Sequence, residues 1–174
     1  MTTLIIGGTG FIGRRLIPRL AQRGEEAVCM DINPQTANYG ELSKVRVLRG
    51  DVSQFDDLMG VMAAVKPDRV INLAYYISSD LPPRVAFKLN ILGMDNCFEA
   101  ARLAGCNRVV YASSVAVSGE QKFYGDRIVN EDDFKHGHLQ YAMHKIFNEW
   151  QAQDYRKKAR DGDHGDPAGQ RHRT

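Results

Sequence analysis

The stretch Gly7-Gly8-Thr9-Gly10-Phe11-Ile12-Gly13 gives the strongest indication of the fold in this 174-residue chain. It follows the apolar run at residues 4–6 and opens a segment with helical spacing. The first glycines permit a sharp turn, the missing side chain at Gly10 lets a pyrophosphate approach the backbone, and Gly13 lets the helix pack close to the strand. The N-terminus of the helix offers free N–H groups to the phosphates. In this strand–turn–helix context the motif predicts a dinucleotide-binding site.

Apolar runs and helical patterns alternate along the rest of the chain. We expect strands at residues 4–6, 27–30, 45–48, 69–73 and 108–112. We expect helices at residues 11–23, 53–65, 84–104 and 139–158, with Ser53 capping the second. This alternation predicts right-handed crossovers and a parallel sheet. The expected fold class is therefore α/β, a doubly wound parallel sheet of the Rossmann type, in one dinucleotide-binding domain over residues 1–158.

Asp31 ends the second expected strand. A carboxylate at this place can bond both ribose hydroxyls of an adenosine and would repel a 2′-phosphate. Because no Arg or Lys follows it immediately, we expect the cofactor to be NAD and not NADP.

Tyr141 and Lys145 lie four residues apart, on one face of the last expected helix. A phenol is a poor base at neutral pH, but a neighbouring ammonium stabilises the phenolate, so the tyrosine can accept or return a proton. The lysine could also reach ribose hydroxyls of a bound dinucleotide. Ser113 and Ser114 follow the fifth expected strand, at the sheet edge where such folds bind ligands. Each of these patterns alone is common, but together they predict a catalytic site.

The whole set closely resembles the extended short-chain dehydrogenase/reductase family, specifically its NAD-dependent epimerase/dehydratase group. The matching segments follow the order and spacing of the family: residues 7–13, 31, 50–52, 70–74, 90–93, 111–119 and 141–145. By resemblance, Ser114 would be the catalytic hydroxyl, Tyr141 the acid/base and Lys145 its partner.

The resemblance also implies roles around the cofactor. Asp51 and Val52 would contact the adenine ring, and Leu73 and Ala74 would line the nicotinamide half. Asn90 would support the active-site helix. The expected cofactor-binding residues are Gly7, Gly10, Phe11, Ile12, Gly13, Asp31, Asp51, Val52, Leu73, Ala74, Asn90 and Lys145.

Two departures from the family bear on the reaction. Val115 and Ala116 stand where the sugar-nucleotide 4,6-dehydratases carry an Asp-Glu pair, and neither can move a proton, so dehydration by that route is disfavoured. Ser118 replaces the tyrosine that is frequent before Gly119. We expect an NAD-dependent epimerase or oxidoreductase acting on a hydroxyl-bearing substrate such as a nucleotide sugar. A non-catalytic NAD-binding protein and an inactive fragment of such an enzyme are the alternatives.

Residues 159–174 differ in composition from the rest of the chain. They contain no aromatic residue and no Leu, Ile, Val or Met, which predicts a disordered tail. Back-translated with suitable synonymous codons and shifted by one base, the segment reads as an apolar strand followed by Arg-Pro-Ala-Asn-Val, as in the family. We therefore expect a frameshift near codon 159, with the C-terminal strands and substrate region missing. The fifth strand would then be an open edge, and we expect weak or no turnover.

Composition narrows the remaining classes. The net charge of +2 arises in the C-terminal segment, so we expect no nucleic-acid partner. No apolar run approaches the ~20 residues of a membrane span, and the N-terminus carries no secretory signal, so we expect a cytoplasmic protein without membrane contact. The three cysteines match no metal spacing, and we expect no metal site. By resemblance, helices near residues 84–104 and 139–158 would pair in a homodimer.

Overall fold

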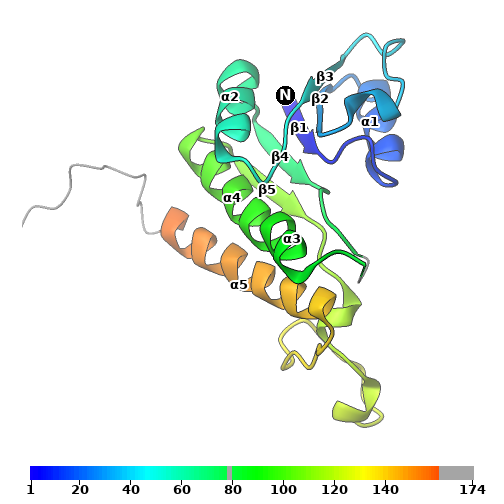
Figure 1. The fold of residues 1–174 in the computed structure, drawn as a ribbon, viewed down its shortest axis with the longest axis vertical. Coiled ribbons are helices and arrows are strands. Elements are labelled where there is room, and N and C mark those ends of the chain that lie inside the picture. Colours follow the sequence, from blue (N-terminus) through cyan, green and yellow to red (C-terminus); the bar gives the residue numbers. More distant parts are fainter. Residues whose placement is uncertain (78–79, 161–174) are drawn as a thin grey trace, which may run out of the picture.

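The computed structural model describes residues 1–77 and 80–160, and the predicted tail falls almost wholly outside them (Figure 1). The centre is a sheet of five parallel strands in the order β3-β2-β1-β4-β5. The strands are β1 (Thr2–Ile6), β2 (Glu26–Asp31), β3 (Val45–Arg49), β4 (Arg69–Asn72) and β5 (Arg108–Tyr111). Each expected strand is confirmed, with shifts of a few residues at the ends.

Five α-helices accompany the sheet within the described residues. They are α1 (Gly13–Gln22), α2 (Phe55–Val65), α3 (Pro83–Phe87), α4 (Gly93–Leu103) and α5 (Gln140–Arg160). In Figure 1, α2, α3, α4 and α5 lie together on one side of the sheet. None of the helices within the described ranges is long and apolar enough to cross a membrane.

Alternate residues of β1 face the two sides of the sheet, and both sides are covered. Leu4 and Ile6 pack into a core formed with α2 and α4, whereas Ile5 packs into a second core formed with Ile17 and Leu20 of α1. Since side chains alternate across a strand, a run that is apolar on consecutive residues requires cover on both faces. This confirms the doubly wound arrangement.

The structure corrects two local expectations. The single helix expected at residues 84–104 is interrupted by a π-helical turn at Lys88–Leu92 between α3 and α4. Ser53 does not cap α2, because α2 begins two residues later and its N-terminal flank, Gln54, makes no side-chain cap. The backbone N–H of Ser53 instead donates to Oδ1 of Asp51 at 2.8 Å.

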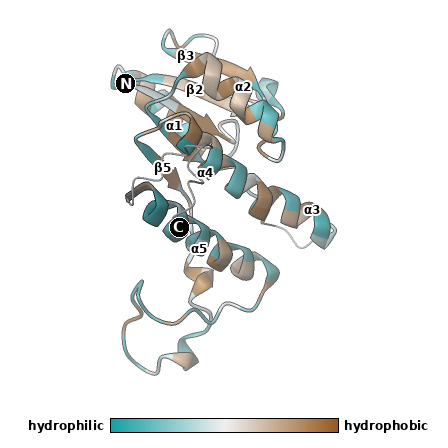
Figure 2. Cartoon of the chain, turned by 90° about the vertical axis from the view of Figure 1, so that its left-hand side faces the viewer, coloured by the Kyte–Doolittle hydropathy of each residue, from teal (hydrophilic) through white to brown (hydrophobic). Residues whose placement is uncertain are grey.

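The segment between β5 and α5 extends away from the sheet in both views (Figures 1 and 2). Tyr124 holds it together, since its hydroxyl lies 2.6 Å from the carbonyl oxygen of Ser118 and 2.7 Å from that of Phe134. Arg127 adds a bidentate ion pair with Asp133 at 2.7 Å. Among the described residues β5 forms the edge of the sheet next to this segment.

Candidate functional site

The glycine turn between β1 and α1 is built as expected. Gly7 has a φ of +74°, and a Cβ there would come within 2.6 Å of the backbone nitrogen of Ala74. A Cβ at Gly13 would overlap the carbonyl of Gly8. A Cβ at Gly10 would meet only the carbonyl oxygen of Gly7, at 3.2 Å. Gly7 and Gly13 are therefore required by packing, while Gly10 leaves space open towards the cleft.

The turn also leaves backbone donors free. Within the described residues, no protein acceptor pairs with the N–H groups of Phe11 and Ile12. The side chains of both residues are exposed and do not line the cleft. Their contribution to a cofactor would therefore come from the backbone, where free N–H groups at a helix N-terminus favour phosphate.

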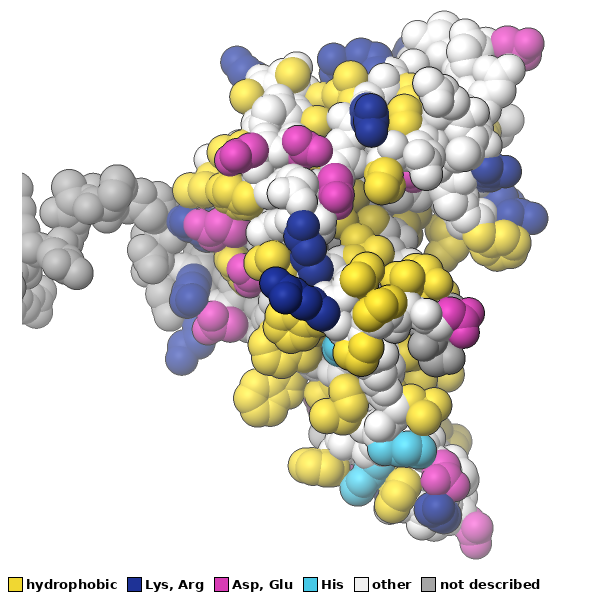
Figure 3. Space-filling view, viewed as in Figure 1, with side chains coloured by type: hydrophobic (Ala, Val, Ile, Leu, Met, Phe, Trp, Pro, Cys, Tyr) yellow, Lys and Arg dark blue, Asp and Glu magenta, His cyan; other side chains and the backbone are white. Residues whose placement is uncertain are grey.

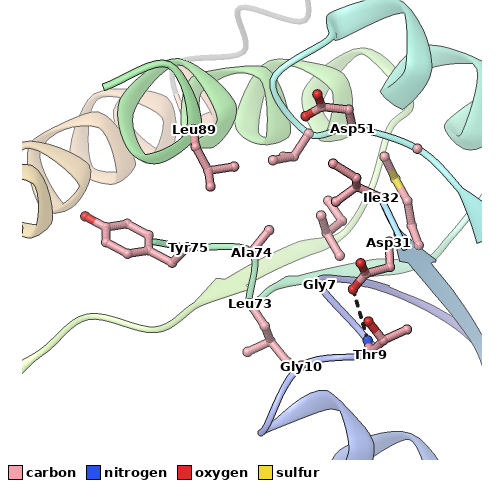
Figure 4. A pocket seen from close by; sticks show the side chains of 14 residues that line it. Gly7, Thr9, Gly10, Asp31, Ile32, Asp51, Leu73, Ala74, Tyr75 and Leu89 are labelled. Carbon is pink, nitrogen blue, oxygen red and sulfur yellow. Dashed lines mark hydrogen bonds between the residues drawn. The ribbon is translucent and has the colours of Figure 1, made fainter. Parts of the chain in front are cut away.

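A cleft of about 280 Å³ opens at the carboxyl ends of β1, β2 and β4 (Figure 4). Seven of the expected cofactor residues line it: Gly7, Gly10, Asp31, Asp51, Val52, Leu73 and Ala74. The structure adds others that motif reasoning did not identify, chiefly Ile32, Tyr75 and Leu89. The glycine motif and the strand ends thus meet in one cavity, as the topology of such sheets requires.

Two carboxylates lie in this cleft, and backbone donors hold both. Asp31 accepts the N–H of Thr9 at 3.1 Å and the N–H of Asn33 at 3.0 Å, so its carboxylate joins the glycine turn to the end of β2 (Figure 4). Asp51 accepts the N–H of Ser53, and its own N–H donates to Asp57 at 2.9 Å. Each carboxylate keeps lone pairs for a ligand hydroxyl or amine.

Lys145 is the most buried cation of the site, with only 3% of its surface exposed. Its ammonium donates to the carbonyl oxygen of Ala112, just after β5, at 2.6 Å. The nitrogen also lies 5.8 Å from the centroid of the Tyr141 ring. Burial lowers the pKa of Lys145 from its ordinary value to about 8. The contact with Ala112 links α5 to the end of β5, where the serine pair begins.

The two serines do not share the cleft with the glycine turn. Both line a second hollow of about 690 Å³, between the end of β5 and the extended segment. Ser114 Oγ accepts the N–H of Ala116 at 3.2 Å, and Ser113 donates to Glu149 of α5 at 2.5 Å. Among the described residues, no hydrogen bond joins Ser114 to Tyr141.

Asn90 lies outside the cleft and joins two parts of the site. It is 2% exposed, and its side-chain amide exchanges two hydrogen bonds of 2.9 Å with the backbone of Tyr76. Its Nδ2 also lies 3.3 Å from Nδ1 of His144 on α5. Burial lowers the pKa of His144, which favours the neutral ring that can accept this bond. This geometry is that of a support for the helix, not of a ligand contact.

Comparison with known proteins points in the same direction as the geometry. A sequence model described as the NAD dependent epimerase/dehydratase family matches residues 3–161. The UDP-glucose 4-epimerase of Mycolicibacterium smegmatis is 37% identical over 123 residues, which cover 66% of this chain and 39% of that protein. Short-chain dehydrogenase/reductase family 42E member 1 of Bos taurus is 27% identical over 146 residues, covering 82% of this chain and 35% of that protein.

A solved structure of similar shape is the UDP-glucose 4-epimerase of Thermus thermophilus in complex with NAD. It matches with a TM-score of 0.81 and 26% identity over 91% of this chain and 51% of that one. The chain thus spans about two fifths of the curated relatives and about half of the solved chain.

Proposed function

Because the chain belongs to the NAD dependent epimerase/dehydratase family, we propose that it binds NAD in the cleft at the glycine turn. We further propose that it belongs to an enzyme that moves a hydride to and from a carbinol carbon of a nucleotide sugar. The observation that carries this proposal is the buried ammonium of Lys145, which lies 5.8 Å from the centroid of the Tyr141 ring and contacts Tyr75 of the cleft.

The residues of the cleft fit NAD in three respects. The open space over Gly10 and the free N–H groups of Phe11 and Ile12 suit a pyrophosphate. Asp31, anchored by two backbone donors, suits the adenosine ribose and disfavours a 2′-phosphate. Val52 and Leu89 line the cleft with apolar side chains, and the carboxylate of Asp51 lines it beside Val52 in the sequence.

In the proposed mechanism, Tyr141 takes the proton of the substrate hydroxyl and later returns it. Lys145, with a pKa lowered to about 8, remains mostly protonated at neutral pH and stabilises the phenolate. Ser114 would donate a hydrogen bond to the reacting oxygen, because within the described residues its Oγ only accepts the N–H of Ala116 and keeps its own O–H free. NAD held by the glycine turn and Asp31 would supply the hydride acceptor and donor for this chemistry.

Epimerisation and simple oxidation share these steps. In epimerisation the ketone intermediate rotates in the site and is reduced on its other face, whereas in simple oxidation it is released. The side chains of Val115 and Ala116 next to the serine offer no group for water elimination, which disfavours dehydration. The relative from Mycolicibacterium smegmatis is a UDP-glucose 4-epimerase, so we propose a UDP-hexose as the first substrate to test.

The test uses the chain with NAD and UDP-glucose, with conversion to UDP-galactose followed by NMR. Tyr141→Phe should reduce any conversion by about 10²-fold or more, the usual contribution of a positioned acid/base, while NAD binding persists. Conversion that Tyr141→Phe leaves unchanged would contradict the catalytic role of Tyr141. NAD binding without conversion or oxidation of any UDP-hexose would favour the two alternatives, a non-catalytic NAD-binding protein or an inactive fragment.

We also propose that two chains pair through α3, α4 and α5. Figure 3 shows hydrophobic side chains gathered on this face of the molecule. Exposed apolar residues of these helices include Val85, Phe87, Met143, Phe147 and Trp150. The three free cysteines and the proposed chemistry favour the reducing cytoplasm as the place of action.

A further inference from the structure

Tyr75 lies between the cleft and the proposed Tyr141–Lys145 pair. It follows Ala74 in the segment after β4 and lines the cleft. In Figure 4 it stands at the end remote from Asp31, beside Leu89. The ring therefore connects the cleft that contains Asp31 with the ammonium of Lys145.

The face of the Tyr75 ring contacts the ammonium of Lys145 directly. The nitrogen lies 3.3 Å from the ring centroid, much closer than its 5.8 Å to the centroid of Tyr141. No carboxylate among the described residues forms an ion pair with Lys145, whose ammonium donates instead to the carbonyl of Ala112. A desolvated cation is attracted electrostatically to the face of an aromatic ring. The Tyr75 ring therefore stabilises the charged form of Lys145, as a carboxylate would do in an ion pair.

The Tyr75 ring also meets Tyr141. The two ring centroids lie 5.7 Å apart at an interplanar angle of 89°. This edge-to-face geometry is a preferred aromatic contact. One side chain thus contacts both members of the proposed catalytic pair, from a strand end that is distant from α5 in sequence.

The hydroxyl of Tyr75 does not account for this placement. It is buried and has no hydrogen-bond partner among the described residues. Burial, and secondly the nearby Tyr141, raise the pKa of Tyr75 above its usual range, which keeps the phenol neutral. A buried hydroxyl without a partner disfavours the folded state. The contacts of the ring with Lys145 and Tyr141 must therefore stabilise the side chain in this position.

We infer that Tyr75 is a positioning residue, whose ring face holds the Lys145 ammonium and whose contact with Tyr141 fixes the phenol before any ligand binds. The inference rests on the proposed function of Tyr141 and Lys145. In this role Tyr75 acts through these two side chains and not on the reacting atoms.

The test compares Tyr75→Phe, which keeps the ring, with Tyr75→Leu, which removes the aromatic face. NMR of the chain without NAD follows the Cε methylene signals of Lys145. Ring current should shift these proton signals upfield in the wild-type protein and in Tyr75→Phe, and the shift should vanish in Tyr75→Leu. Tyr76→Leu, in the neighbouring residue, is the matched control and should leave the signals unchanged.

A pH titration of the same signals gives a second readout. Tyr75→Leu should lower the pKa of Lys145 by about 0.5–1.5 pH units, because the cation loses its aromatic partner while apolar cover remains. Tyr75→Phe should leave the pKa within about 0.3 units, since the ring face is kept. If Tyr75→Leu loses its dispersed amide spectrum, Tyr75→Met offers the same comparison with a more adaptable side chain.

An unshifted Lys145 signal in the wild-type protein would overturn the inference. So would a Tyr75→Leu protein whose Lys145 pKa is unchanged or raised. Both readouts are taken without cofactor, so they do not depend on NAD binding or turnover. A chain that binds NAD normally but fails both readouts would refute this inference and leave the proposed function standing.

Discussion

Replacing Gly7 with alanine should destabilise the fold more than the same replacement at Gly105. Both glycines have left-handed backbones, with φ of +74° and +70°. A Cβ at Gly105 meets nothing within 4 Å, whereas one at Gly7 comes within 2.6 Å of the nitrogen of Ala74. The loss of unfolding free energy in Gly105→Ala therefore measures the backbone strain alone. The difference between the losses in Gly7→Ala and Gly105→Ala measures the steric clash.

The magnitude follows from these two contributions. Left-handed backbone costs an L-residue about 1–2 kcal/mol, so Gly105→Ala should lose about that much unfolding free energy. Forcing a methyl group into packed backbone adds about 1–3 kcal/mol, so Gly7→Ala should lose about 2–5 kcal/mol. Urea unfolding followed by circular dichroism measures both values. Equal losses in the two variants would refute the close approach of the turn to the end of β4.

Three further predictions concern charge and assembly. Asp31→Asn should weaken NAD binding and reduce the ratio of the affinities for NAD and NADP, both measured by calorimetric titration. An unchanged ratio would show that Asp31 does not contact the adenosine ribose. Burial lowers the folded pKa of Lys145 to about 8 from its ordinary value of 10.5, so its charge destabilises the fold fully below pH 8 and this penalty disappears as pH rises to 10.5. The unfolding free energy of the wild-type protein should therefore rise by on the order of 3 kcal/mol between pH 8 and 10.5, and Lys145→Met should lack this rise. Equal pH profiles of stability for the two proteins would contradict the prediction. Light scattering should give a dimer for the wild-type chain and a monomer for the Phe147→Glu/Trp150→Glu variant, whereas a wild-type monomer would contradict the proposed pairing.

Most of the fold is predictable from local pattern. Apolar runs locate the five strands, and the glycine turn identifies the β1–α1 unit, because both signals lie within a few consecutive residues. The site residues that come from the glycine motif and the strand ends also meet as expected, since parallel strands bring their carboxyl ends to one edge of the sheet.

What sequence pattern misses depends on contacts between distant segments. The hydrogen bond between Ser113 and Glu149 and the contact of Asn90 with His144 join residues 36 and 54 positions apart. Tyr75 follows the matched Leu-Ala segment, but nothing in its neighbourhood indicates that its ring will cover Lys145. Likewise Ser53 carries a good capping side chain, yet Asp51 holds its backbone and α2 begins at Phe55.

The central claim is that the glycine turn forms an NAD site, and NAD titration of the wild-type chain against Gly10→Ala tests it most directly. A Cβ at Gly10 would meet only the carbonyl oxygen of Gly7, at 3.2 Å, so the variant should lose much less unfolding free energy than Gly7→Ala. Its methyl group would occupy space meant for the pyrophosphate, and affinity should fall at least about tenfold, or 1.4 kcal/mol. A wild-type chain that binds no NAD, or a Gly10→Ala chain that binds it equally well, would contradict this claim.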